Sequence, residues 1–333
     1  MKFHNPLAPE LLEEYDPEFV EVYNRTGIEN PSVVELSPEE NRRWRLQRLA
    51  KLDKSTVESV TDYAYGPEEE QQLRVFVPKG DRPSTGWPVY MHYHGGGWVL
   101  GGIGSEDILL GQLAYTVHCV SISANYRHAP ESPFPAAAED AWAAFEYIHA
   151  NAENLGIDVS KLIVGGDSAG ANLTETVTQR LVAHNEQSSS PYPQLLHQVL
   201  IVPQADATDR TKYQSFRKYA NAAGLGEKEV DYFYKHYFGD RPVHHDIRAS
   251  PLLNDDKVFA KLPPATVLIA GMDPLRDEGI AYVQKMEKNG VKVDTTVFEG
   301  LPHGFMTFPI AKTDELVQLY VKAVQSAIHD GQS

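Results

Sequence analysis

Apolar residues along this chain gather in short runs, separated by longer stretches that have the spacing of amphipathic helices. The runs predict strands at residues 89–93, 120–123, 162–164, 198–202, 266–270 and 291–294, after an alternating strand-like segment at 73–77. The longer stretches predict helices at residues 106–117, 136–150, 169–184, 277–288 and 313–329. Short apolar strands that alternate with helices are typical of a mostly parallel sheet covered on both faces. We therefore expect an α/β protein.

Two segments depart from this alternation. Residues 1–54 have a helical pattern and precede the strands, with Ser37 suited to cap a helix that starts at Pro38. Residues 204–250 are polar and aromatic and interrupt the strand series. We expect both segments to form a helical cap over the carboxyl edge of a main domain made of residues 55–203 and 251–333. The alternative is that both are surface excursions with no role in ligand binding.

A candidate nucleophile follows the predicted strand at 162–164. The segment Gly166-Asp167-Ser168-Ala169-Gly170 places a serine where a strand turns sharply into a helix. Such a bend exposes the serine side chain at its apex, and the flanking glycines avoid clashes with neighbouring backbone. Ser168 is therefore the predicted nucleophile.

A serine nucleophile needs a base and a group that orients the base. His303 follows the last predicted strand in a turn with proline and glycine, and Asp273 lies just past the strand at 266–270. Asp277 and Glu278 are rivals for the acid, but they fall inside a helix and are more simply interpreted as solvated charges or charges at a helix N-terminus. The chain order Ser168, Asp273, His303 is that of the α/β-hydrolases.

Backbone amides are needed to stabilise the oxyanion that forms during acyl transfer. Ala169 offers one amide at the start of its helix, and the loop after His94 offers others, because its three glycines let successive N–H groups approach one point. We expect His94 itself to hold this loop by a hydrogen bond.

At these positions the sequence resembles the hormone-sensitive-lipase-like family of α/β-hydrolases. The resemblance rests on His94-Gly95-Gly96-Gly97-Trp98, Asn125-Tyr126-Arg127-His128-Ala129-Pro130-Glu131, Gly166-Asp167-Ser168-Ala169-Gly170, Asp273-Pro274-Leu275-Arg276-Asp277-Glu278-Gly279 and Pro302-His303-Gly304-Phe305. It implies an eight-stranded, mostly parallel sheet with a helical cap, and an oxyanion hole made by the amides of Gly96, Gly97 and Ala169. Tyr126, Arg127 and Glu131 are expected to be structural, with an arginine–carboxylate pair holding a loop.

Composition narrows the possible partners. The net charge of −16 disfavours nucleic acid and anionic membrane surfaces, which are bound through Lys and Arg. The N-terminus lacks the apolar core of a signal peptide, and no apolar stretch has the length of a membrane span. The one cysteine, Cys119, is expected to be buried and reduced. We therefore expect a cytoplasmic protein. The pairs His92/His94 and His244/His245 lack a convincing third ligand, so we expect no metal and no cofactor.

These observations predict a serine carboxylesterase that hydrolyses small-molecule esters with short to medium acyl chains. Trp98, Phe305 and Met306 indicate apolar pockets, whereas the polar, acidic cap does not suggest a lipase lid. Amidase, lactonase or specialised deacylase chemistry on the same triad is the alternative, and the retained His303 disfavours a non-catalytic receptor on this scaffold. A homodimer is possible, because the edge strand at 291–298 could pair with a second copy.

Overall fold

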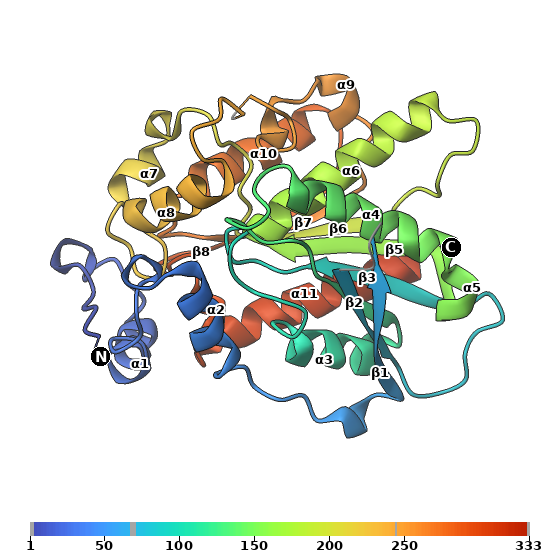
Figure 1. The fold of residues 1–333 in the computed structure, drawn as a ribbon, viewed down its shortest axis with the longest axis horizontal. Coiled ribbons are helices and arrows are strands. Elements are labelled where there is room, and N and C mark those ends of the chain that lie inside the picture. The colour runs from blue at the N-terminus through green and yellow to red at the C-terminus, as the bar shows by residue number, and fades with distance from the viewer. Residues whose placement is uncertain (1–2, 67–70, 244, 332–333) are drawn as a thin grey trace.

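A computed structural model describes residues 3–66, 71–243 and 245–331, and its centre is one eight-stranded sheet in the order β1-β2-β4-β3-β5-β6-β7-β8 (Figure 1). The strands are β1 (Ser59–Tyr65), β2 (Gln71–Val77), β3 (Trp87–Tyr93), β4 (Val120–Ala124), β5 (Ile157–Asp167), β6 (His197–Ile201), β7 (Ala265–Ala270) and β8 (Val293–Phe298). The pairings β1–β2 and β2–β4 are antiparallel, and all the others are parallel. The predicted mostly parallel eight-stranded sheet is confirmed.

Helices cover both faces of this sheet, as the periodicity predicted (Figure 1). The helices are α1 (Pro17–Thr26), α2 (Pro38–Leu46), α3 (Asp107–Val117), α4 (Ala136–Ala150), α5 (Ala152–Leu155), α6 (Ala169–Gln187), α7 (Gln214–Lys218), α8 (Glu227–Tyr237), α9 (Asp256–Phe259), α10 (Arg276–Lys288) and α11 (Ala311–Asp330). Alternate residues of β3 enter different cores: Val89 and Met91 pack with α4, whereas Tyr90 packs with α3 and α11. Burial on both faces explains why this strand is a continuous apolar run. None of the described helices is both long and apolar enough to cross a membrane.

Strands β5 and β8 differ most from the sequence prediction in their bounds. Strand β5 begins at Ile157, before the apolar run at 162–164, because its first residues are partly polar. Strand β8 runs to Phe298, beyond the predicted end at residue 294. It lies at the edge of the sheet, where the partly exposed Thr295 and Thr296 interrupt the apolar pattern.

The N-terminal segment packs against the C-terminal part of the chain. Helix α2 begins as predicted: the Ser37 hydroxyl accepts the amide of Glu40 at 3.3 Å, and the Glu40 carboxylate accepts the amide of Ser37 at 2.9 Å. Phe19 of α1 meets Phe308 edge-to-face, with ring centroids 5.3 Å apart. Figure 1 shows α1 and α2 at the same end of the sheet as α7 and α8.

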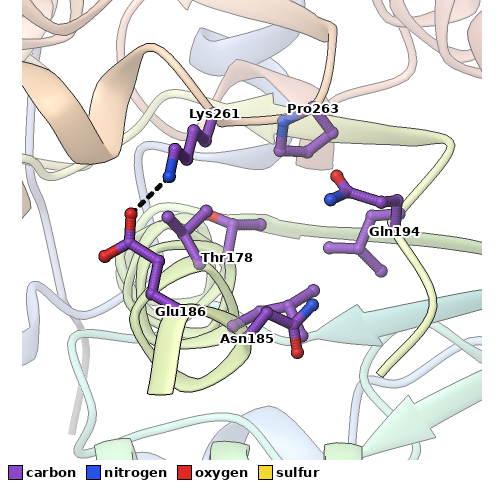
Figure 2. Close-up of a pocket in the computed structure, with 9 residues that line it drawn as sticks. Thr178, Asn185, Glu186, Gln194, Lys261 and Pro263 are labelled. Atoms are coloured by element: carbon purple, nitrogen blue, oxygen red, sulfur yellow. Dashed lines mark hydrogen bonds and ion pairs between the residues drawn. The ribbon is translucent and has the colours of Figure 1, made fainter. Parts of the chain in front are cut away.

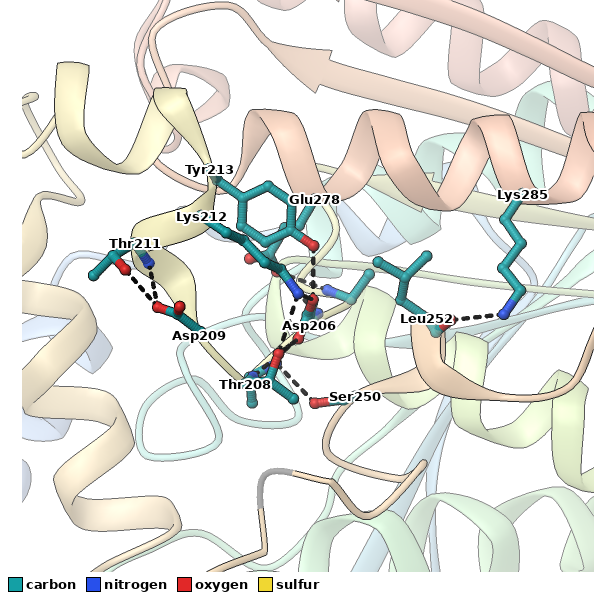
Figure 3. Close-up of polar contacts among 12 residues, drawn as sticks. Asp206, Thr208, Asp209, Thr211, Lys212, Tyr213, Ser250, Leu252, Glu278 and Lys285 are labelled. Atoms are coloured by element: carbon teal, nitrogen blue, oxygen red, sulfur yellow. Dashed lines mark hydrogen bonds and ion pairs between the residues drawn. The ribbon is translucent and has the colours of Figure 1, made fainter.

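A polar network around the buried Asp206 joins the start of segment 204–250 to helix α10 (Figure 3). The Asp206 carboxylate accepts hydrogen bonds from the Tyr213 hydroxyl at 2.6 Å and from the Lys212 ammonium. Glu278 of α10 accepts the amides of Ala205 at 2.8 Å and Asp206 at 3.2 Å. The start of the segment is therefore fixed to α10, and α8 is carried from it across the carboxyl end of the sheet.

Candidate active site

Ser168 lies at the junction of β5 and α6, as the sequence predicted. Its backbone φ of 53° and ψ of −117° fall in a sparsely populated region, a strain of about 1–3 kcal/mol that surrounding structure must hold. A Cβ on Gly166 would lie 2.3 Å from the carbonyl oxygen of Gly170, and a Cβ on Gly170 would lie 1.9 Å from that of Tyr93. No side chain fits at either glycine, so the sharp bend requires both.

The structure brings Ser168, His303 and Asp273 into one hydrogen-bonded line. His303 Nε2 lies 2.8 Å from Ser168 Oγ, and His303 Nδ1 lies 2.6 Å from Asp273 Oδ2. The second carboxylate oxygen of Asp273 accepts the amide of Leu275 at 2.9 Å, and its side chain is 1% exposed. Asp273 is thus held from both sides, with one oxygen left to orient the imidazole.

The rival acids lie elsewhere. Asp277 accepts the amide of Ser215 at 2.8 Å and pairs with Arg276. Glu278 lies in the first turn of α10, as one of the two interpretations had it, but it is not solvated, because its side chain is buried and accepts two amides from the segment after β6. Burial raises the pKa of Glu278 well above its usual value, so this carboxyl belongs to the core.

The glycine loop after β3 lies beside the nucleophile. Gly96 and Gly97 have φ values of 114° and 61°, which favour glycine. Within the described residues, nothing accepts a hydrogen bond from the amide of Gly96, Gly97 or Ala169, so all three are available to a ligand. His94 holds the loop as expected, with Nδ1 2.8 Å from the Gly95 carbonyl oxygen.

Asp167 joins this loop to the nucleophile bend. Its Oδ1 accepts the amide of Gly95 at 2.9 Å and lies 3.3 Å from His92 Nε2. Sequence analysis assigned no role to Asp167, because nothing in its sequence neighbourhood shows which amide its carboxylate reaches.

A cavity of about 1210 Å³ opens onto these groups. Its walls come from α1, α2, α3, α8, α11, the glycine loop and the loops that carry Ser168 and His303. Apolar lining residues include Phe19, Leu49, Phe233, Met306 and Phe308. Trp98 and Met306 line the cavity as the sequence suggested, whereas Phe305 is buried and packs against Phe298 instead.

A smaller hollow of about 250 Å³ lies between the end of α6 and the loop before β7 (Figure 2). It is lined by Thr178, Gln194 and Pro263 and bordered by the Lys261–Glu186 ion pair. None of its lining residues forms a nucleophile–base pair, so the larger cavity is the candidate active site.

The residues expected to be structural have definite partners. Arg127 pairs with Asp140 at 2.6 Å, and Glu131 pairs with Arg42 at 2.8 Å. Each holds a loop with an arginine–carboxylate pair, as expected.

Cys119 is free and buried, and burial raises the pKa of its thiol to about 12, which keeps it protonated and unreactive.

One group of side chains has the ligand types of a metal site. Ligand atoms of His92, Glu106 and Asp167 lie within 4.8 Å of one another. The sequence offered no third ligand for His92, because Glu106 lies in a loop without any metal-binding pattern. Burial, together with the charges of Asp167 and Asp107, raises the pKa of Glu106 well above its usual value, so a cation would have to displace its proton. The other histidine pair includes His244, which lies outside the described residues.

Comparison with known proteins agrees with this geometry. The family model described as alpha/beta hydrolase fold matches residues 90–307. The carboxylic ester hydrolase LipN of Mycobacterium tuberculosis is 36% identical over 267 residues, covering 78% of this chain and 69% of the relative. An ethyl acetate hydrolase of Pseudomonas putida is 36% identical over 255 residues, covering 76% of this chain and 77% of the relative. The crystal structure of EstE1, a thermostable carboxylesterase from a metagenomic library, has a TM-score of 0.78 and 31% identity, covering 89% of this chain and 99% of its own.

The fold and the match over residues 90–307 define an α/β-hydrolase. More narrowly, the chain belongs to the hormone-sensitive-lipase-like family of these proteins, and it is a carboxylic ester hydrolase. The resemblance and the reaction class that the sequence predicted are confirmed at this level.

Proposed function

We propose that this protein is a serine carboxylesterase that works through an acyl-enzyme intermediate. Ser168 is the nucleophile, His303 is the general base and acid, and Asp273 fixes the imidazole tautomer. The observation that carries this proposal is the hydrogen-bonded line Asp273–His303–Ser168, with distances of 2.6 and 2.8 Å, at the wall of the large cavity.

Each step follows from the atoms in reach. Ser168 Oγ attacks the ester carbonyl carbon while its proton passes to His303 Nε2, and the negative charge on the carbonyl oxygen is met by the amides of Gly96, Gly97 and Ala169. The tetrahedral intermediate collapses, the C–O bond to the alcohol breaks, and the alkoxide leaves with the proton from His303. Water then attacks the acyl-enzyme with the same base, which releases the carboxylic acid and restores Ser168.

The substrates are small-molecule esters with short to medium acyl chains. The apolar walls around Phe19, Phe233 and Phe308 support an uncharged carbon chain near the reacting carbonyl. A relative named ethyl acetate hydrolase supports the short end of the range. Amide, lactone or specialised deacylation substrates are the alternative on the same residues, since the same three groups serve each reaction.

Residues 1–54 and 204–250 act as a helical cap over residues 55–203 and 251–333. Support comes from the cavity, whose walls include side chains of both segments. The segments also touch each other, because the Ser32 hydroxyl donates to the Glu229 carboxylate on α8.

Turnover of 4-nitrophenyl esters from acetate to palmitate, measured beside Ser168→Ala, tests the proposal. Replacing the nucleophile should lower kcat by about 10⁶, while circular dichroism and melting temperature stay unchanged. Activity should peak at short or medium chains. A variant that keeps its activity would refute the assignment of Ser168, and an intact protein that hydrolyses amides or lactones but no ester would favour the alternative.

A homodimer through β8 and a cytoplasmic location complete the proposal. β8 is the last strand of the sheet and leaves its outer edge without a partner strand in the described part of the chain. Light scattering on the purified protein would reveal a dimer, and a monomer at every concentration would refute it. Fractionation of the source cells would test the location.

A further inference from the structure

Four arginines lie on or just after α2, and one of them differs from the rest. Arg42 pairs with Glu131 at 2.8 Å, Arg43 pairs with Glu39 at 2.7 Å, and Arg48 stacks on the ring of Trp44 with its guanidinium carbon 3.9 Å from the ring centre. The Arg45 side chain has no hydrogen bond and no ion pair with any residue that the structure describes. An arginine that keeps its donors free, next to three that use theirs, needs a physical explanation.

Arg45 faces the active-site cavity. It lines the same cavity as Ser168 and His303, and its side chain keeps accessible surface there. Arg45 is an exposed residue, so its guanidinium at the cavity wall is within reach of a ligand bound there.

Asp167 and Glu106 are two of the carboxyl groups that line the same cavity as Arg45. Asp167 accepts the amide of Gly95 at 2.9 Å and faces His92. Glu106 also lines the cavity, and burial raises its pKa well above its usual value. Neither carboxyl forms an ion pair with Arg45. Because no described residue uses its donors, the Arg45 guanidinium at the cavity wall is free to bind an anionic ligand group.

We propose that Arg45 binds an anionic group of the substrate, so that the preferred ester carries a carboxylate at a distance from the bond that is hydrolysed. This inference rests on the proposed esterase function and narrows its substrate class to monoanionic esters. The planar guanidinium matches a carboxylate with two parallel N–H···O bonds, which a lysine cannot reproduce. The reaction is unchanged: Ser168 still forms and loses the acyl bond, and Arg45 only positions the substrate.

A carboxylate on either the acyl or the alcohol side satisfies the proposal, so the experiment includes both. On the acyl side, 4-nitrophenyl hydrogen adipate is compared with 4-nitrophenyl hexanoate, which has the same acyl length without the charge. On the alcohol side, 4-carboxyphenyl hexanoate is compared with phenyl hexanoate. The ratio of kcat/KM for the anionic ester to that for its neutral partner is measured in wild type, Arg45→Gln, Arg45→Lys and Arg43→Gln.

For at least one pair, Arg45→Gln should lower this ratio by about 10- to 100-fold, mainly through KM, because a charge-assisted hydrogen bond is lost. Arg45→Lys should retain part of the ratio. Arg43→Gln is the matched control, because it removes a charge from the same helix at an exposed ion pair, and it should leave the ratio unchanged.

The two proposals fail in different ways. If Arg45→Gln leaves the ratio unchanged for both pairs, or lowers the anionic and neutral rates equally, Arg45 does not recognise an anion, although the esterase function stands. If the wild type hydrolyses none of the four esters, the proposed function fails and takes this inference with it.

Discussion

Replacing Asp273 by asparagine should disable the base without disturbing the fold. Asp273 accepts two hydrogen bonds, from Leu275 N at 2.9 Å and from His303 Nδ1 at 2.6 Å. Asparagine has one carbonyl oxygen and one NH₂ group, so it can keep the bond to the Leu275 amide only by turning its NH₂ toward His303. Nδ1 must then accept, the imidazole proton moves to Nε2, and Nε2 no longer accepts the proton of Ser168.

The size of the loss follows from this tautomer. A wrong tautomer of a triad histidine costs about 10⁴ in kcat, or about 5 kcal/mol of transition-state stabilisation. We expect this loss of kcat for Asp273→Asn when hydrolysis of 4-nitrophenyl butyrate is measured, together with a melting temperature close to that of wild type. Asp277→Asn is the control, because Asp277 binds the Ser215 amide and Arg276 but does not reach His303. A loss of less than tenfold in Asp273→Asn, or a larger loss in Asp277→Asn, would refute the assignment of the acid.

Two further predictions concern the core and the oxyanion loop. Glu175 is fully buried, neither of its carboxylate oxygens has a partner among the described residues, and burial raises its pKa well above the usual value. The folded state therefore keeps a proton that the unfolded state loses, and its free energy of unfolding falls as pH rises above the unfolded pKa. Glu175→Gln should thus become more stable than wild type by up to about 1.4 kcal/mol per pH unit in that range. Urea unfolding at pH 5 and pH 8 measures this, and an equal change in the free energy of unfolding for both proteins would contradict it. A Cβ on Gly97 would lie 2.2 Å from the Phe233 ring, so Gly97→Ala should displace the Gly97 amide and lower kcat by about 10²–10³. The double variant Gly97→Ala/Phe233→Ala should recover part of the activity, and a wild-type kcat in the single variant would show that this amide does not bind the oxyanion.

The sheet was predictable where both faces of a strand are buried. Strands β3 and β7 are buried at every residue, and their apolar runs stand out from the sequence. Strand β8 is partly exposed at the sheet edge, so its pattern ended too early in the prediction. The apolar pattern of a strand depends on which of its faces are buried, so it does not by itself give the residue at which the strand ends.

Some residues of the candidate site were also predictable from the sequence, and others were not. Ser168, Asp273 and His303 were predictable because each follows a strand in a turn whose chemistry is local. The partners of Asp167 and Glu278 were not, because each is decided by a contact with a segment far away in the chain. Glu278 was expected to be a solvated charge or a charge at a helix N-terminus. It lies in the first turn of α10, but its carboxylate accepts the amides of Ala205 and Asp206, 73 and 72 residues away, which its local sequence does not show.

The geometry of the site depends on the register of two neighbouring parallel strands. Tyr93 of β3 lies opposite Gly166 of β5, and this pairing places the glycine loop and the nucleophile bend side by side at the carboxyl edge. A slip of one residue would exchange the side chains that β3 sends to its two faces, so the close packing of the two cores fixes the register. Asp167 then joins the two loops through the Gly95 amide, which holds the strained Ser168 and the oxyanion amides in one frame. Groups as far apart in sequence as Ser168 and His303 can meet at 2.8 Å because the packed sheet, and not either loop, sets their separation.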